Sequence, residues 1–140
     1  MAIFTNQAQL RYGNAVANSN VAVGEILEVL AATKTAVRKT YGQNDRVTYV
    51  VSIVNSGNTA MTGLMVADDL GAYAFGTDTL VPLTYVADTV RYYSNGILQT
   101  TPAVTAGPPL SVSGISVPAG GNVTIVYEAE TNAFAPLLAE

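Results

Sequence analysis

The stretch Asp45–Asn55, DRVTYVVSIVN, decides the fold of this chain. Apolar and polar residues alternate along most of it, and a period of two is typical of a β-strand with one face against a core. The preceding Tyr41–Asp45 contains Gly and Asn, which predict the turn that starts the strand. The residues expected to face the core are Val47, Tyr49, Val51 and Ile53.

Similar short runs continue along the chain, separated by Gly, Pro, Asn and Asp. Asn122–Glu130 predicts the last strand and Thr62–Asp68 predicts another. Asn95-Gly96, between two β-type runs, predicts a tight hairpin, because both residues tolerate positive φ. In Asn122–Glu130 the positions expected to point inward are Val123, Ile125, Tyr127 and Ala129. In Thr62–Asp68 they are Leu64 and Val66.

Two segments are harder to assign. Gly24–Ala36 has a composition that a helix tolerates, although the Thr-rich segments on both sides favour a strand. Asp69–Asp88 carries Gly71, Gly76 and Pro82, and we expect it to be mostly loop.

The pattern of short strands and turns predicts an all-β, immunoglobulin-like β-sandwich. Residues 30–130 approach the roughly 100 residues that such a sandwich needs. We therefore divide the chain into an N-terminal extension (residues 1–23), a sandwich domain (24–131) and a C-terminal tail (132–140).

The composition excludes several kinds of chemistry. The chain has no Cys and no His, so it lacks disulfides, thiolate metal sites and the commonest general base. Charged residues make up only 11%, against about 25% in an ordinary soluble domain. A net charge of −4 with scattered basic residues does not suit nucleic acid. We expect no enzyme activity, no cofactor and no nucleic-acid partner, and a neutral surface suited to contact with other subunits.

The N-terminal sequence MAIFTNQAQLRYGN lacks the charged and apolar regions of a signal peptide. Either a signal is removed or the protein is made without one, and Met1 favours the second reading. No stretch reaches the roughly 18 apolar residues of a membrane span. We expect an extracellular protein, or a protein of a cell or spore surface. Without a signal peptide, lysis of the producing cell would release it.

The segment Asp45–Leu70 resembles the conserved-repeat domain of bacterial surface proteins, domain of unknown function eleven. Lys34 matches the opening of that repeat, and Pro118–Gly120 with the VTIVYE run matches its closing strand. The resemblance covers about residues 30–131 and implies a β-sandwich used in tandem on stalks and adhesins, without enzyme activity. Family members usually carry many repeats and a secretion signal. The residues that match the central pattern are Asp45, Val47, Thr48, Tyr49, Ile53, Asn55, Gly57, Leu64, Val66, Asp68 and Leu70.

In such arrays the closing strand runs on into a segment that here has its counterpart at Ile3–Tyr12, at the other end of the chain. We therefore expect one unit of an array, which head-to-tail polymerisation would restore without covalent joints. An extended segment of one copy would pair with an exposed sheet edge of the next. The expected donor residues are Ile3, Phe4, Asn6, Ala8, Leu10 and Tyr12, with Phe4, Ala8, Leu10 and Tyr12 inward. The expected acceptor residues are Tyr127, Phe134, Pro136 and Leu137.

Alternatives remain open for the arm and for the function. Residues 2–23 could instead fold back on their own domain as a hairpin, or form a disordered arm. The chain could also be a monomeric adhesion module that contacts a glycan or protein through the loops around 71–88 and 102–109.

Two further features carry possible chemistry. The Asp68-Asp69 pair could bind Ca²⁺, although capping of a turn by Asx hydrogen bonds is the favoured interpretation. Lys34 could form an isopeptide bond with Asn55 or Asn132 if one of them lay opposite it, with Asp68 or Glu128 as proton shuttle.

Overall fold

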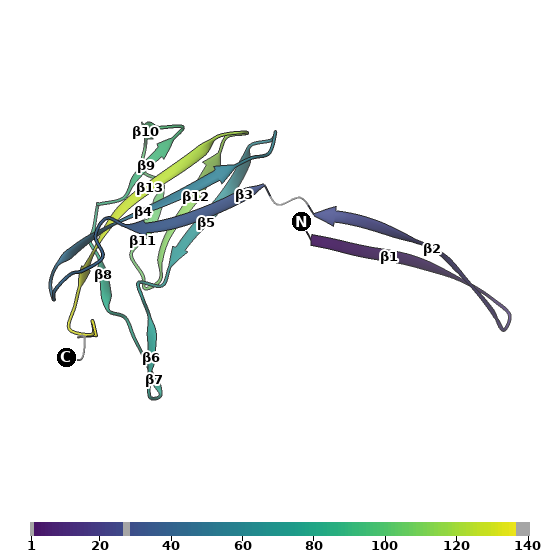
Figure 1. Ribbon diagram of the computed structural model, residues 1–140, viewed down its shortest axis with the longest axis horizontal. Helices are drawn as coiled ribbons and strands as arrows, with labels where there is room; N and C mark the ends of the chain where they lie inside the picture. The colour runs from purple at the N-terminus through teal and green to yellow at the C-terminus, as the bar shows by residue number, and fades with distance from the viewer. Residues whose placement is uncertain (1, 27–28, 137–140) are drawn as a thin grey trace.

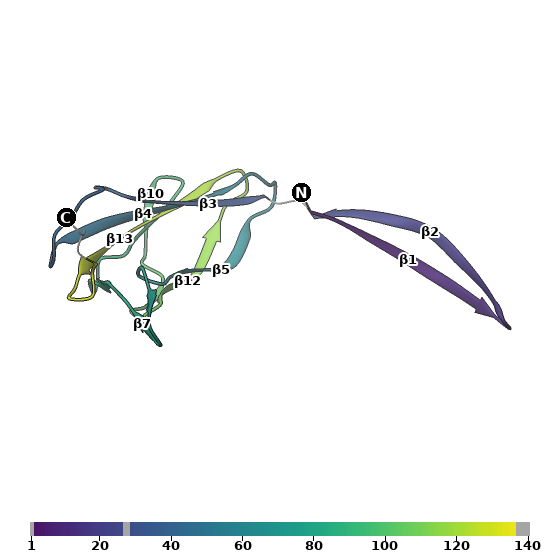
Figure 2. The same cartoon turned by 60° about the horizontal axis from the view of Figure 1, so that its bottom comes forward.

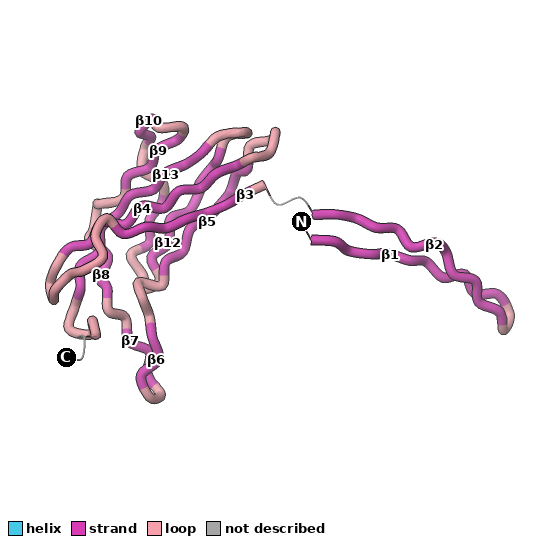
Figure 3. Tube along the Cα trace, viewed as in Figure 1, coloured by secondary structure: helices cyan, strands magenta, loops and turns pink. Residues whose placement is uncertain are grey.

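The computed structural model describes residues 2–26 and 29–136, and all regular structure in them is β (Figures 1 and 3). None of these residues forms a helix that could cross a membrane. The strands are β1 (Ala2–Tyr12), β2 (Ala15–Ile26), β3 (Leu30–Ala36), β4 (Arg46–Asn55), β5 (Met61–Asp68), β6 (Tyr73–Phe75), β7 (Asp78–Leu80), β8 (Leu83–Tyr85), β9 (Arg91–Ser94), β10 (Ile97–Gln99), β11 (Ala103–Thr105), β12 (Leu110–Val117) and β13 (Asn122–Thr131).

Two antiparallel sheets face each other, which confirms the predicted all-β sandwich (Figure 2). The larger sheet has the order β10-β9-β13-β4-β3, and β8 also pairs with β13. The smaller sheet has the order β11-β12-β5. The core fills the space between them, because the inward-facing residues of each sheet are apolar.

The central strands β4 and β13 supply most of this core. Burial alternates along both strands, and Val47, Tyr49, Val51 and Ile53 face inward as the sequence predicted. Val123, Ile125, Tyr127 and Ala129 of β13 are also buried, which confirms their predicted orientation. Tyr49 pairs with Tyr127 across the two strands, with ring centroids 5.8 Å apart.

Turn residues join these strands as their conformational preferences dictate. Asn95 and Gly96 connect β9 to β10 with φ of 49° and 81°, so the predicted hairpin is confirmed. Asn55 is fully buried, and its side chain holds the turn that follows β4. The amide nitrogen donates to the carbonyls of Thr59 and Val117, and the amide oxygen accepts from the Gly57 N–H.

The N-terminal segment forms a long hairpin of β1 and β2, from Ala2 opposite Ile26 to Tyr12 opposite Ala15. Neither strand pairs with a strand of the sandwich, and the hairpin extends away from it (Figures 1 and 2). The segment is therefore a hairpin, as one alternative held, but it does not fold back on its own domain.

Two segment assignments have clear outcomes. Leu30–Ala36 of the ambiguous segment is strand β3, as favoured, while residues 27–28 lie outside the described part. The expectation that Asp69–Asp88 is mostly loop holds, because 11 of its 20 residues lie outside strands, but the segment also contains the three short strands β6, β7 and β8. Gly76, with φ of 64°, turns β6 back onto β7 rather than marking a loop.

Candidate functional site

One side of the sandwich is open. β3 is the outer strand of the larger sheet and β5 is the outer strand of the smaller sheet. In the described ranges each pairs with a single neighbour, β3 with β4 and β5 with β12. Both strands therefore present a free edge of backbone N–H and C=O groups.

The inward face of β3 is uncovered. Ala32, Lys34 and Ala36 lie opposite Ile53, Val51 and Tyr49 of β4, which are all buried. Their positions on the core side predict burial, yet all three β3 residues are exposed. The smaller sheet ends at β5, and among the described residues no further strand of that sheet lies across the core from β3. The inward face of β3 is therefore left exposed.

The space between the two outer strands is a groove of about 460 Å³, which we call the edge groove. Leu64 and Val66 of β5 point inward as predicted but are only half-buried, because no strand of the described ranges pairs with β5 on this side. The groove reaches the core through Val51 and Tyr127. The residues that line it include Ala32, Lys34, Val51, Val66, Asp68 and Tyr127.

A polar cluster ties the two sheets together at this open side. Lys34 Nζ of β3 lies 2.6 Å from Asp68 Oδ2 at the end of β5, and the Tyr127 hydroxyl donates to the same carboxylate. Lys34 Nζ also lies 4.4 Å from the centroid of the Tyr49 ring. We call Lys34, Asp68 and Tyr127 the sheet clasp.

The clasp holds Asp68 in its charged form. Burial alone would raise the pKa of Asp68, but hydrogen bonds from Lys34, Tyr127 and the Leu70 amide outweigh it, and its pKa is lowered. Burial, together with the hydrogen bond to Asp68, raises the pKa of Tyr127, so this hydroxyl stays a neutral donor. Asp68 is thus saturated with donors and serves as a structural anion rather than a base.

The Asp68-Asp69 pair caps a turn through hydrogen bonds to backbone amides. Asp68 Oδ1 accepts from the Leu70 N–H and Asp69 Oδ1 accepts from the Gly71 N–H, as the turn interpretation requires. No cluster of three candidate metal ligands occurs within the described ranges.

The structure does not place Lys34 beside the asparagines proposed for an isopeptide bond. Asn55 lies opposite Leu30, four positions along β3 from Lys34. Asn132 donates to the Val81 carbonyl and to Thr84. Lys34 instead makes its ion pair with Asp68, the residue that the isopeptide hypothesis assigns to proton transfer.

The expected acceptor residues are spread over three hollows. Tyr127 forms part of the floor of the edge groove. Pro136 lines a hollow of about 470 Å³ that shares Lys34 and Asp69 with the edge groove. Phe134 lines a separate hollow, and Leu137 lies outside the described residues.

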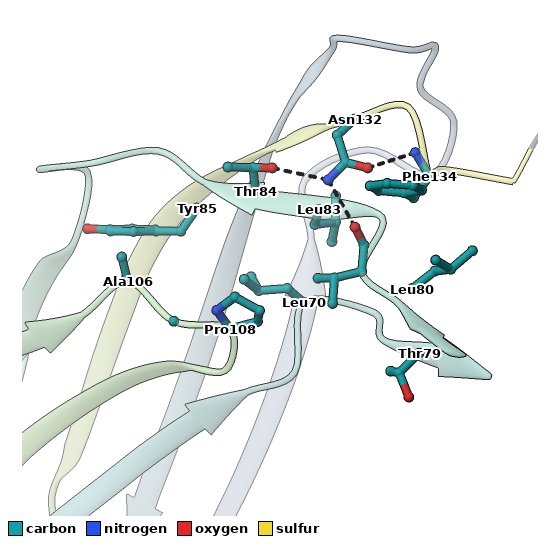
Figure 4. Close-up of a pocket in the computed structure, with 12 residues that line it drawn as sticks. Leu70, Thr79, Leu80, Leu83, Thr84, Tyr85, Ala106, Pro108, Asn132 and Phe134 are labelled. Atoms are coloured by element: carbon teal, nitrogen blue, oxygen red, sulfur yellow. Dashed lines mark hydrogen bonds between the residues drawn. The ribbon is translucent and has the colours of Figure 1, made fainter. Parts of the chain in front are cut away.

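The hollow that contains Phe134 lies at the end of the sandwich away from the hairpin, with a volume of about 390 Å³ (Figures 1 and 4). Leu70, Leu83 and Pro108 give it an apolar lining. Asn132 fixes one rim, because its side chain bonds to Val81, Thr84 and the Phe134 N–H.

The expected donor residues all lie on β1, the first strand of the hairpin. Ile3 and Leu10 are 66% and 63% exposed, and Asn6 and Ala8 are exposed as well. The side chains of Phe4 and Tyr12 lie outside the described part, although their backbones pair with Gly24 and Ala15.

The two rows of the hairpin differ in bulk. Phe4, Asn6, Leu10 and Tyr12 are paired with small residues of β2, whereas the intervening positions of β1 are paired mostly with larger ones. Among the described side chains of this row, Leu10 of β1 is larger than its β2 partner Ala17. The small partners in β2 are Gly24, Ala22, Ala17 and Ala15.

Sequence reasoning did not assign Ala32 or Val66 to the acceptor, although it placed Val66 on the inward face of its strand; both line the edge groove. Nothing local to either residue identifies an outer strand, because the position of a strand in a sheet depends on distant partners. The one available signal was the row of small residues in LAATKTA, which is unusual on the core side of a strand.

Comparison with protein-family models, curated proteins and solved structures finds no match to this chain. Function must therefore be argued from the geometry. An open sheet edge over exposed core residues is suited to receive an added strand, and the exposed hairpin is a strand pair with free outer edges.

Proposed function

We propose that this chain is the structural subunit of a non-covalent filament outside the cell or on a cell or spore surface. Copies join head to tail by β-augmentation, in which the N-terminal hairpin of one subunit adds to the sandwich of the next. The observation that carries the proposal is that one chain contains both an exposed hairpin and an open sandwich edge, which do not pair with each other.

Exposure of the hairpin supports the proposal. Five large apolar side chains of β1 and β2 are at least half exposed, and an isolated two-stranded hairpin is only marginally stable in water. Contact with another copy through the face that carries Leu10 would bury part of this apolar surface and stabilise the hairpin. The five residues are Ile3, Leu10, Val16, Val21 and Val23.

The geometry of such a contact favours a filament. The hairpin and the open edge are different surfaces, so each subunit would use one to bind a neighbour and leave the other free. A contact of this heterologous kind propagates unless its rotation closes a ring. The low charge of the chain and its resemblance to repeats of surface proteins support the proposed location.

A monomeric adhesion module is the second candidate, and one observation favours it. The hollow in Figure 4 is lined from both loop regions that the sequence suggested for ligand contact, by Thr79–Tyr85 on one side and Ala106–Pro108 on the other. Its apolar lining with a polar rim is the usual character of a small ligand site.

Size-exclusion chromatography and negative-stain electron microscopy separate the two candidates. The full chain should form filaments, and a chain without residues 1–26 should not. Leu10→Asp should also abolish them, because it places a charge in the row that assembly buries. Val23→Asp is the matched control, since Val23 is 65% exposed on the opposite face of the hairpin, and it should still assemble. A monodisperse full-length monomer would contradict the filament.

A further inference from the structure

We infer that β1 of one copy hydrogen-bonds antiparallel to the free edge of β5 in the next copy and covers the uncovered face of β3. This inference rests on the proposed function and specifies the surface that receives the hairpin. The smaller sheet would gain a fourth strand from its neighbour, and the edge groove would become part of a closed core.

The missing strand belongs to the smaller sheet. A strand added to β3 would extend the larger sheet further and leave Ala32 and Lys34 still exposed on their core side. A strand added to β5 would lie opposite β3 and cover both residues together with Val66. Only the second position fills the edge groove.

Strand direction selects β1 rather than β2. β3 and β5 both run away from the hairpin, because each begins at the end of the sandwich where the hairpin is attached (Figure 1). The contact of Lys34, in the second half of β3, with Asp68, the last residue of β5, agrees with this shared direction. β1 runs outward toward its turn at Gly13. When copies follow one another in the same orientation, β1 meets β5 antiparallel, whereas β2 would meet it parallel. Antiparallel pairing is the more stable of the two per residue.

The lengths are compatible. β5 has 8 residues and β1 has 11, which at about 3.3 Å per residue correspond to about 26 Å and 36 Å. β1 is therefore long enough to pair with the regular part of β5, Leu64–Asp68, which follows the positive φ of 67° at Gly63. About half of the β5 residues would gain backbone hydrogen bonds, because alternate residues of a strand bond to each side.

The side chains are complementary in size. Ala32 and Ala36 on the core side of β3 leave room above Val51 and Tyr49. On the donor, Leu10 of β1 is paired with the small Ala17 of β2. The large side chain of Leu10 would thus lie over small side chains of the acceptor, as close packing requires.

Disulfide trapping in the full chain tests this assignment, because the chain contains no Cys. Two double variants combine Leu10→Cys in β1 with Val66→Cys in β5, and Ala8→Cys with Val66→Cys. Two control double variants combine the same β1 substitutions with Leu98→Cys, which is 57% exposed on β10 at the opposite edge of the larger sheet. A disulfide forms only where two Cβ atoms approach to about 4 Å.

After mild oxidation, non-reducing gels should show a ladder of covalent oligomers for at least one Val66 variant and none for the Leu98 variants. The four single variants should give no ladder, because a ladder needs two different linking sites in each copy. If microscopy shows filaments but neither Val66 variant gives a ladder, the acceptor assignment is wrong while the proposed function stands. If no variant and no wild-type chain forms filaments, the proposed function fails, and this inference fails with it.

Discussion

The sheet clasp makes a quantitative prediction for Asp68→Asn. Asp68 is 8% exposed and accepts from Lys34, Tyr127 and the Leu70 amide. The Asn side chain keeps an oxygen for Leu70 but loses the two bonds to a charged carboxylate, each worth about 1.5–3 kcal/mol. The Lys34 side chain is 41% exposed and water can solvate it after the change. We therefore expect the free energy of unfolding to fall by about 2–3 kcal/mol, since part of the loss is recovered.

The pH dependence follows from the lowered pKa of Asp68. Its ordinary value is 3.8 and the folded value is lower, so its stabilising contribution is complete above pH 3.8 and disappears as the pH falls through the folded pKa. The difference in free energy of unfolding between wild type and Asp68→Asn should therefore be largest at neutral pH and become smaller in acid.

Urea denaturation followed by circular dichroism measures this difference. Both chains should carry Leu10→Asp, because assembly would otherwise stabilise the folded state by mass action. Asp69→Asn is the matched control, since Asp69 is exposed and its Asn replacement keeps the bond to the Gly71 amide, and it should change stability by less than about 0.5 kcal/mol. Two results would refute the role of the clasp. One is a loss of unfolding free energy in Asp68→Asn no larger than in Asp69→Asn, and the other is a difference in unfolding free energy between wild type and Asp68→Asn that grows in acid.

Two further predictions concern the buried turn and the acceptor edge. Asn55→Ala should lower the free energy of unfolding by about 1–3 kcal/mol in urea denaturation, because it leaves the buried Val117 carbonyl without its donor, whereas the exposed Asn58→Ala should have little effect. Val66→Asp should leave a folded chain that cannot accept a strand, so that light scattering detects no filaments; the neighbouring Met65→Asp, at a position 63% exposed on the outer face of β5, should assemble normally. Filaments from Val66→Asp, or an unchanged stability of Asn55→Ala, would contradict the respective prediction.

The central strands could be predicted because their signal is local. In β4 and β13, side chains alternate between core and solvent over ten residues each, so the sequence repeats the period of the strand. The turn at Asn95-Gly96 was predictable for a similar reason, since two adjacent residues tolerate its positive φ.

The short strands could not be predicted in this way. β6, β7 and β8 have three residues each, too few to show a period, and β8 exists because it pairs with β13 more than forty positions later in the chain. A glycine in such a segment indicates a turn but does not show whether strands flank it.

The candidate site depends on contacts that are remote in sequence. Lys34 and Asp68 are 34 positions apart, and the exposure of Ala32 follows from the absence of a strand across the core within the described part of the chain. The donor role of the β1 residues therefore stays a prediction from a continuous stretch of sequence, and the sequence did not assign Ala32 or Val66 to the acceptor. The acceptor residues predicted near the C-terminal tail include Phe134 and Pro136, which the structure places in two different hollows.

Hydrogen exchange of the backbone amides tests the central claim most directly. Mass spectrometry would compare peptides from β1 and β5 in dilute monomer and in assembled material of the same full chain. Pairing of β1 with β5 of the next copy predicts that both strands become protected together on assembly, while β10 at the opposite edge stays unchanged. Assembled material in which β5 exchanges as fast as in the monomer would contradict strand addition at this edge.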